Sequence, residues 1–395
     1  MSETQSGTRS FRQNSAKKGN ERTASLASGS AWVPLLFTAL AVSSLGAGPR
    51  EDFAQLEAEM QAATEAYYSA LFEAEQNRED SASGDPRPAA GKLRDPRSDV
   101  LKKMDALAQS IADTPDGRLI ALNTFYWAVG VQPETLFQRF GIISRQNREE
   151  SELAEVIISL PDLFAQSGSA EQWTQSLNAF ARSTGKKDLK LAATFAAARI
   201  HMVSGQTSQA KSAFEDAIKL AADEPDAARA AKGYLFEIQN LQVGMKAPEF
   251  RARTLDDRDL TLSSLRGKVV LLDFWATWCA PCISEIPHLA KIAARFRERG
   301  FEIVAISLDD SREAVQNALG SLKVPGIVVW DEKGPDNPVV ELYNVQSLPT
   351  WYLLDRDGVI RGRDLDLIKL ESMVESILPA DSRAKKESDE AAKAP

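Results

Sequence analysis

Residues 274–287, FWATWCAPCISEIP, decide the fold of the region around them, because two cysteines lie here between a predicted strand and a predicted helix. Cys279 and Cys282 are the two cysteines of the 395-residue sequence. Before them, residues 268–274 (KVVLLDF) are mostly apolar and include two β-branched valines, which predicts a buried strand. After them, residues 282–299 have apolar side chains at helical spacing. We therefore expect Cys279 at the N-terminus of a helix.

That position favours thiol chemistry at the first cysteine. Unpaired backbone N–H groups and the positive end of the helix macrodipole stabilise a thiolate there. Cys282, one turn further into the helix, can reach back to Cys279 because residues i and i+3 are neighbours. A zinc site is the alternative, but it needs a second ligand pair, and His201 and His288 lack the spacing for one. We expect a reactive thiol pair, with neither a metal ion nor another cofactor.

The sequence around the cysteines alternates between strands and helices. Further strands are predicted at residues 301–308, 326–330, 350–354 and 359–361, and further helices at 312–322 and 365–377. Alternation of this kind predicts an α/β sheet.

Several separated segments resemble the thioredoxin superfamily, and more narrowly its extracytoplasmic TlpA/ResA-like thiol-disulfide oxidoreductases. Besides FWATWCAPCISEIP, these segments are residues 244–250 (GMKAPEF), 260–270 (LTLSSLRGKVV), 347–350 (SLPT) and 353–358 (LLDRDG). They resemble that group's N-terminal hairpin, the entry to its central strand, its cis-proline loop and a later hairpin. The resemblance covers residues 241–379 and implies a thioredoxin-like domain with a central mixed sheet flanked by helices.

The resemblance also implies roles for the residues around the cysteines. Cys279 would be the nucleophile and Cys282 the resolving thiol. Asp273 matches the buried carboxylate that accepts the proton of the resolving cysteine, although it could be an ordinary polar residue of a strand. Glu285 matches an acidic residue that this group often carries after the second cysteine, and a simple carboxylate in the first turns of a helix explains it equally well.

Three further residues are expected to bind the substrate. Pro349 would follow a cis peptide bond and present the backbone of Leu348 to a client strand, whereas a trans turn proline is the alternative. Trp278, next to Cys279, would form an exposed apolar rim for docking.

The chain before residue 241 is predicted to be helical. Residues 51–98 read as a long amphipathic helix followed by a linker rich in Pro, Gly and Ser, and residues 99–240 as a helical region. Small and aromatic residues in this region recur at spacings similar to tetratricopeptide helix pairs: Ala197, Ala198, Gly205, Ala210, Phe214 and Ala217, with a looser copy at Gly168, Trp173, Leu177 and Phe180. An irregular helical bundle is the alternative.

The two ends of the chain have other signals. Residues 1–50 combine a basic leader with the apolar run of residues 32–48, which predicts a cleaved signal peptide or an uncleaved membrane anchor; a disordered tail with one hydrophobic patch is the alternative. A signal peptide or an anchor places the rest of the chain outside the cytoplasm, in the periplasm or cell envelope. Residues 380–395 are charged and alanine-rich and read as a solvated, disordered tail.

The composition of the chain argues against nucleic-acid binding. A formal net charge of -9 provides no basic surface for nucleic acid. The leading hypothesis is an exported enzyme that reduces protein disulfides, with electrons from an upstream membrane or periplasmic donor. The same dithiol could instead act as an oxidase or isomerase, because its reduction potential sets the direction. In another hypothesis the helical region is a binding scaffold and the thioredoxin-like part is accessory.

Overall fold

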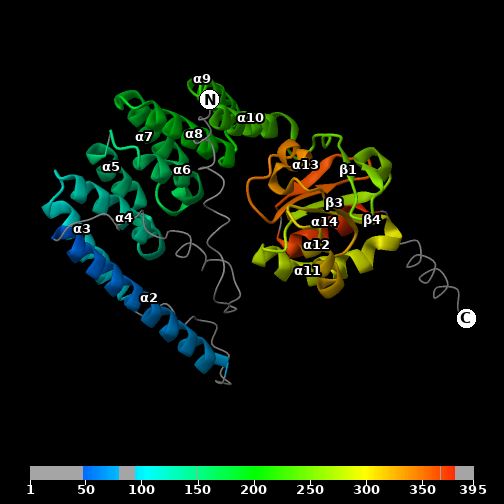
Figure 1. Ribbon diagram of the computed structural model, residues 1–395, viewed down its shortest axis with the longest axis horizontal. Coiled ribbons are helices and arrows are strands. Elements are labelled where there is room, and N and C mark those ends of the chain that lie inside the picture. The colour runs from blue at the N-terminus through cyan, green and yellow to red at the C-terminus, as the bar shows by residue number, and fades with distance from the viewer. Residues whose placement is uncertain (1–47, 80–93, 148, 365, 379–395) are drawn as a thin grey trace, which may run out of the picture. The chain divides into compact units, whose positions relative to one another are not determined.

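The computed structural model describes residues 48–79, 94–147, 149–364 and 366–378 (Figure 1). The predicted tail, most of the linker and residues 1–47, which hold most of the predicted signal or anchor, lie outside the described residues. Among the residues that are described, no helix is both long and apolar enough to cross a membrane. The chain divides into two compact units between Gln146 and Asn147. The boundary expected at residues 240/241 falls inside the second unit.

The first unit is helical. Its helices are α2 (Pro49–Glu79), α3 (Arg97–Ser110), α4 (Pro115–Val131) and α5 (Leu136–Gln146). Buried apolar side chains such as Phe53 and Met60 of α2 form its core. Helix α4 begins at Thr114, whose side chain accepts the Gly117 N–H at 3.0 Å, and Pro115 occupies the first helical position, where no N–H is needed.

The second unit begins with five more helices. They are α6 (Leu153–Leu163), α7 (Ala170–Ser183), α8 (Lys187–Val203), α9 (Thr207–Leu220) and α10 (Pro225–Asn240). Ala210 and Ala217 of α9 are fully buried, and Phe214 between them stacks on Tyr234 of α10 with ring centroids 5.4 Å apart. Small buried residues allow such helices to approach closely. The tetratricopeptide character of these pairs stays a prediction.

A five-stranded mixed sheet follows, in the order β5-β4-β3-β6-β7. Its strands are β3 (Val269–Trp275), β4 (Phe301–Ser307), β5 (Ile327–Val329), β6 (Thr350–Leu354) and β7 (Ile360–Arg363). Strands β3, β4 and β5 are parallel, β6 runs antiparallel to β3, and β7 antiparallel to β6. The central strand β3 is buried along its whole length, which explains its continuous apolar sequence.

Helices cover both faces of this sheet (Figure 1). They are α11 (Ala280–Phe296), α12 (Arg312–Leu322), α13 (Pro338–Leu342) and α14 (Leu367–Ile377). Because side chains alternate along a strand, Leu271 of β3 packs into the core under α11 and α14, whereas Leu272 packs into the core on the opposite face. A helical region followed by an α/β thioredoxin-like domain confirms the predicted fold class.

Helix α13 was not predicted from the sequence. It begins after Asn337, whose side-chain oxygen accepts the Val339 N–H at 2.7 Å, and Pro338 is its first residue. The Asn-Pro pair is therefore a helix start, although it reads equally well as a turn.

One segment before β3 covers both outer strands of the sheet. It contains the hairpin of β1 (Arg251–Arg253) and β2 (Asp259–Thr261). The Leu255 N–H donates to the Val328 carbonyl of β5 at 2.8 Å. At the opposite edge, the Gly244 N–H donates to the Ile360 carbonyl of β7, also at 2.8 Å. Each outer strand thus has hydrogen-bond partners on its outer side.

Candidate active site

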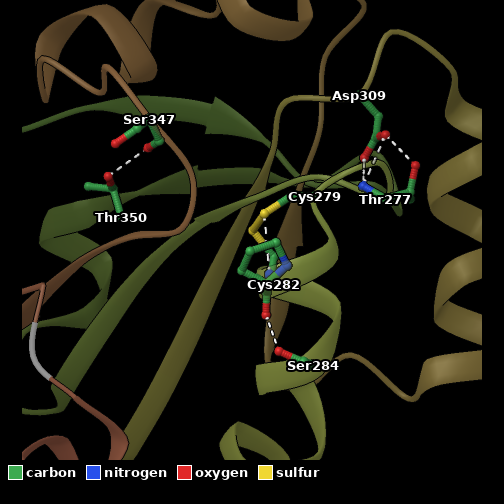
Figure 2. The surroundings of a disulfide bond; sticks show 8 residues. Thr277, Cys279, Cys282, Ser284, Asp309, Ser347 and Thr350 are labelled. Atoms are coloured by element: carbon green, nitrogen blue, oxygen red, sulfur yellow. Dashed lines mark hydrogen bonds between the residues drawn. A yellow bond between two sulfur atoms is a disulfide. The ribbon is translucent and has the colours of Figure 1, made fainter. Parts of the chain in front are cut away.

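The two cysteines form a disulfide at the start of α11 (Figure 2). Cys279 is the capping residue of this helix, and its Sγ accepts the Cys282 N–H at 3.2 Å. Pro281 lies in the first turn, where its missing N–H costs no hydrogen bond. The sulfur of Cys279 therefore lies where a backbone donor and the helix dipole both favour negative charge.

Asp273 lies on β3 and Glu285 on α11, the elements on either side of the disulfide, and within the described residues no cation offsets the charge of either carboxylate. Asp273 of β3 is buried, and burial together with the negative charge of Glu285 raises its pKa to about 7. The Trp351 indole, opposite Asp273 in the strand register, opposes this rise only in part; its N–H forms no hydrogen bond of normal geometry within the described residues. Desolvation also raises the pKa of Glu285 to about 7.

The two acids interact electrostatically. The negative charge of Glu285 disfavours the charged form of Asp273 and so contributes to its raised pKa. One oxygen of Glu285, Oε2, is buried without a hydrogen-bond partner in the described part of the chain. The structure thus brings together both acids that the sequence singled out and leaves each able to exchange a proton near neutral pH.

A third acid, Asp309, holds the turn before the cysteines. It follows β4, is 3% exposed, and accepts the Thr277 N–H at 3.0 Å and the Thr277 hydroxyl at 2.6 Å (Figure 2). Ser307 donates a further hydrogen bond to it at 2.8 Å. Thr277 lies two residues before Cys279, so Asp309 fixes the backbone that leads into the disulfide. From the sequence alone, Asp309 could not be separated from a solvated turn.

The expected cis-proline loop faces the same core. We use this name for residues 344–349. The Leu348–Pro349 peptide is cis, and Leu348 packs against the apolar cluster that contains both cysteines. At the end of the loop, the Thr350 hydroxyl donates to the Ser347 carbonyl at 2.8 Å. In Figure 2 this pair and the Thr277–Asp309 pair flank the disulfide on its two sides.

A large hydrophobic side chain is exposed next to the disulfide. Trp278 is 65% exposed, whereas the adjacent Cys279 is 5% exposed. A large exposed indole beside a buried reactive group is typical of a docking surface. Within the described residues, no group of three His, Cys, Asp or Glu side chains is arranged to hold a metal ion.

This strand order, with a cysteine pair at the start of the helix after the central strand and a cis-proline before β6, defines a thioredoxin-like thiol-disulfide enzyme. Comparison with known proteins supports this assignment to the thioredoxin-like class. The family model described as the AhpC/TSA family matches residues 243–363.

Similar proteins of known name place the chain more narrowly among the thiol-disulfide oxidoreductases. The chain is 34% identical over 131 residues to the thiol-disulfide oxidoreductase ResA of Bacillus cereus, covering 33% of this chain and 73% of the relative. It is 37% identical to ResA of Bacillus subtilis, covering 31% and 66%. Among solved structures it is similar to the thioredoxin domain of a thiol-disulfide oxidoreductase from Bacteroides vulgatus, with 30% identity, coverage of 35% and 100%, and a TM-score of 0.34. The chain belongs to the family of ResA thiol-disulfide oxidoreductases.

Proposed function

We propose that this chain is an exported reductase of protein disulfides that acts through Cys279 and Cys282. The observation that carries the proposal is the position of Cys279: its sulfur accepts the Cys282 N–H at a helix start, beside the exposed Trp278. The cis-proline loop supplies backbone groups with which an extended client segment can pair.

The reaction starts from the reduced dithiol. The Cys279 thiolate attacks one sulfur of a client disulfide, forms a mixed disulfide and releases the other client sulfur as a thiolate. Cys282 then loses its proton and attacks the Cys279 sulfur. This step closes the Cys279–Cys282 disulfide and releases the second client sulfur, so that two electrons pass from the enzyme to the client.

Asp273 is suited to accept the proton of Cys282. A pKa of about 7 makes it a stronger base than an ordinary Asp, and it is still ionised in part at neutral pH. Glu285 contributes by its charge, which keeps the pKa of Asp273 high. An upstream dithiol donor, in the membrane or periplasm, would reduce the disulfide again for the next cycle.

The leader of residues 1–50 supports the proposed location outside the cytoplasm, with the protein either secreted or held through residues 32–48. The helical residues 99–240 are proposed to hold clients or partners, because stacked helix pairs build extended binding surfaces. The helical region would then bind the client and the thioredoxin-like domain would reduce it.

Reduction of insulin by the full-length protein, with dithiothreitol as the donor, tests the proposal. We expect precipitation of the insulin B chain at a rate that depends on Cys279, and a reduction potential nearer to about -270 mV than to about -120 mV, the reducing and oxidising ends of the superfamily. A potential at the oxidising end, with rapid oxidation of reduced ribonuclease A, would instead establish the oxidase or isomerase.

A further inference from the structure

The last turns of α10 contact the thioredoxin-like domain through a buried carboxylate. Glu237 is 1% exposed, and both of its partners come from that domain. Its carboxylate accepts the Asn344 side-chain N–H at 2.6 Å and a hydrogen bond from the Arg363 guanidinium of β7. A buried carboxylate keeps its charge when a guanidinium and a second donor compensate it. Glu237 therefore joins α10 to the sheet and to Asn344.

Asn344 is the first residue of the cis-proline loop. It is buried and has a φ of 46°, in the left-handed region that Asn tolerates better than most residues. Its side-chain oxygen accepts the Gln346 Nε2–H at 2.7 Å. One amide thus links Glu237 on one side to Gln346 on the other, three residues before Pro349.

Close packing accompanies this link. A Cβ atom at Gly233 of α10 would overlap with the side-chain oxygen of Asn344, so with any larger residue either the helix or the Asn344 amide would have to shift. Phe236, next to Glu237, packs against the apolar cluster that contains both cysteines, and Leu348 of the loop packs against the same cluster. The helix and the loop are therefore in direct contact.

We propose that α10 sets the conformation of the cis-proline loop through the link between Glu237 and Asn344, which makes these two residues positioning residues for client binding. The proposal rests on the proposed function, because it assigns the loop to clients. A helix of the predicted scaffold is then part of the substrate site. A partner that shifts α10 changes how a client strand fits against Leu348 and the disulfide.

The geometry suggests two different variants for a test in the full-length protein. Asn344→Gly keeps the left-handed backbone, which glycine adopts freely, and removes both side-chain bonds of the link. Gly233→Ala removes no polar group and instead crowds the Asn344 amide, so that either α10 or the amide must shift. Glu371→Gln is the matched control, because it removes an exposed ion pair with Arg295 on the opposite side of the domain's core.

The readout is the reduction of insulin compared with reduction of Ellman's reagent, a small disulfide that needs no client strand. For both variants we expect the KM for insulin to rise about tenfold while kcat falls less than about twofold, as for an interaction that contributes equally to the bound substrate and the transition state. Their rates with Ellman's reagent and their reduction potentials should stay close to those of the control Glu371→Gln.

Two results would overturn the proposal. One is a wild-type KM for insulin in both variants when circular dichroism shows that they are folded. The other is a parallel loss of insulin and Ellman's activity together with a shifted potential, which would assign the link to the stability of the whole domain. If the wild-type protein oxidises clients rather than reducing them, the proposed direction fails, and the same KM comparison is made with reduced ribonuclease A.

Discussion

The acidic residues on the two sides of the disulfide differ in whether a positively charged group offsets their charge. On the β3–α11 side, Asp273 and Glu285 have no cation beside them among the described residues, and the pKa of each is raised to about 7. On the cis-proline side, Glu237 is more deeply buried than either, yet Arg363 and Asn344 compensate its charge. An acid without a cation can exchange a proton during a reaction, whereas a compensated acid holds two elements together. Asp273 and Glu285 are therefore suited to proton transfer, whereas Glu237 is suited to holding α10 against the sheet.

The largest expected effect separates the two cysteines themselves. Cys279→Ala should abolish exchange, because the helix start activates the first thiol alone. Cys282→Ala should instead accumulate mixed disulfides with clients, since nothing resolves them. Non-reducing gels with insulin as the client distinguish these outcomes. As a check on the assignment, alkylation of the reduced wild-type protein near pH 7 should modify Cys279 first, and faster modification of Cys282 would reverse the two roles.

The next effect is on proton transfer. Asp273→Asn should slow resolution of the mixed disulfide by about 10²-fold, the lower end of general acid–base catalysis, where water can substitute in part. The wild-type rate should rise as the pH increases through about 7, because Asp273 must be ionised to accept a proton, and the variant should lack this rise. Single-turnover kinetics between pH 5 and 9 measure it. If the wild type and Asp273→Asn had identical pH–rate profiles, Asp273 would have a structural role and not a catalytic one.

Stability provides an independent measurement on the same variant. The pKa of Asp273 is raised on folding from 3.8 to about 7, so between these pH values the folded protein holds a proton that the unfolded chain has lost. The stability from this proton is complete below pH 3.8 and is lost as the pH rises through about 7. The free energy of unfolding of the oxidised wild type should therefore fall by about 2 to 4 kcal/mol between pH 4 and 8, relative to Asp273→Asn. Urea titrations at the two pH values test the sign.

The smallest effect concerns the coupling between the two acids. Glu285→Gln removes a negative charge that raises the pKa of Asp273, so the pH at which activity rises should move downward, with a change of less than about threefold in the rate at pH 8. Glu313→Gln, on the exposed first turn of α12, serves as the control. A shift toward higher pH would mean that Glu285 stabilises the ionised form of Asp273.

The sequence predicted the elements whose signals are local. Residues 268–274 and 301–308 are predicted as strands, and β3 and β4 lie there because β-branched and aromatic side chains pack well on a pleated, buried surface. The helix expected from residue 282 begins at Ala280, because Pro281 fits the first turn of a helix. The cysteines, the cis peptide and the buried Asp273 were found through motifs of a few residues.

The supporting acids could not be found in this way. Asp309 follows a strand and looks like a solvated turn, and its partner Thr277 lies 32 residues away. Glu237 looks like part of an exposed helix face, and its partners lie 107 and 126 residues further along the chain. In both cases tertiary packing decides whether the carboxylate is buried, and no nearby residue signals the partner.

The segment that covers both outer strands has a consequence for self-association. An uncovered edge strand presents free N–H and C=O groups to which another chain can add, and this is a common route to aggregation. Here residues before β3 occupy the outer sides of both β5 and β7. A second copy of the chain therefore finds these hydrogen-bonding groups already paired. During synthesis this segment leaves the ribosome before the sheet it covers, so both edges can be capped as soon as the strands assemble.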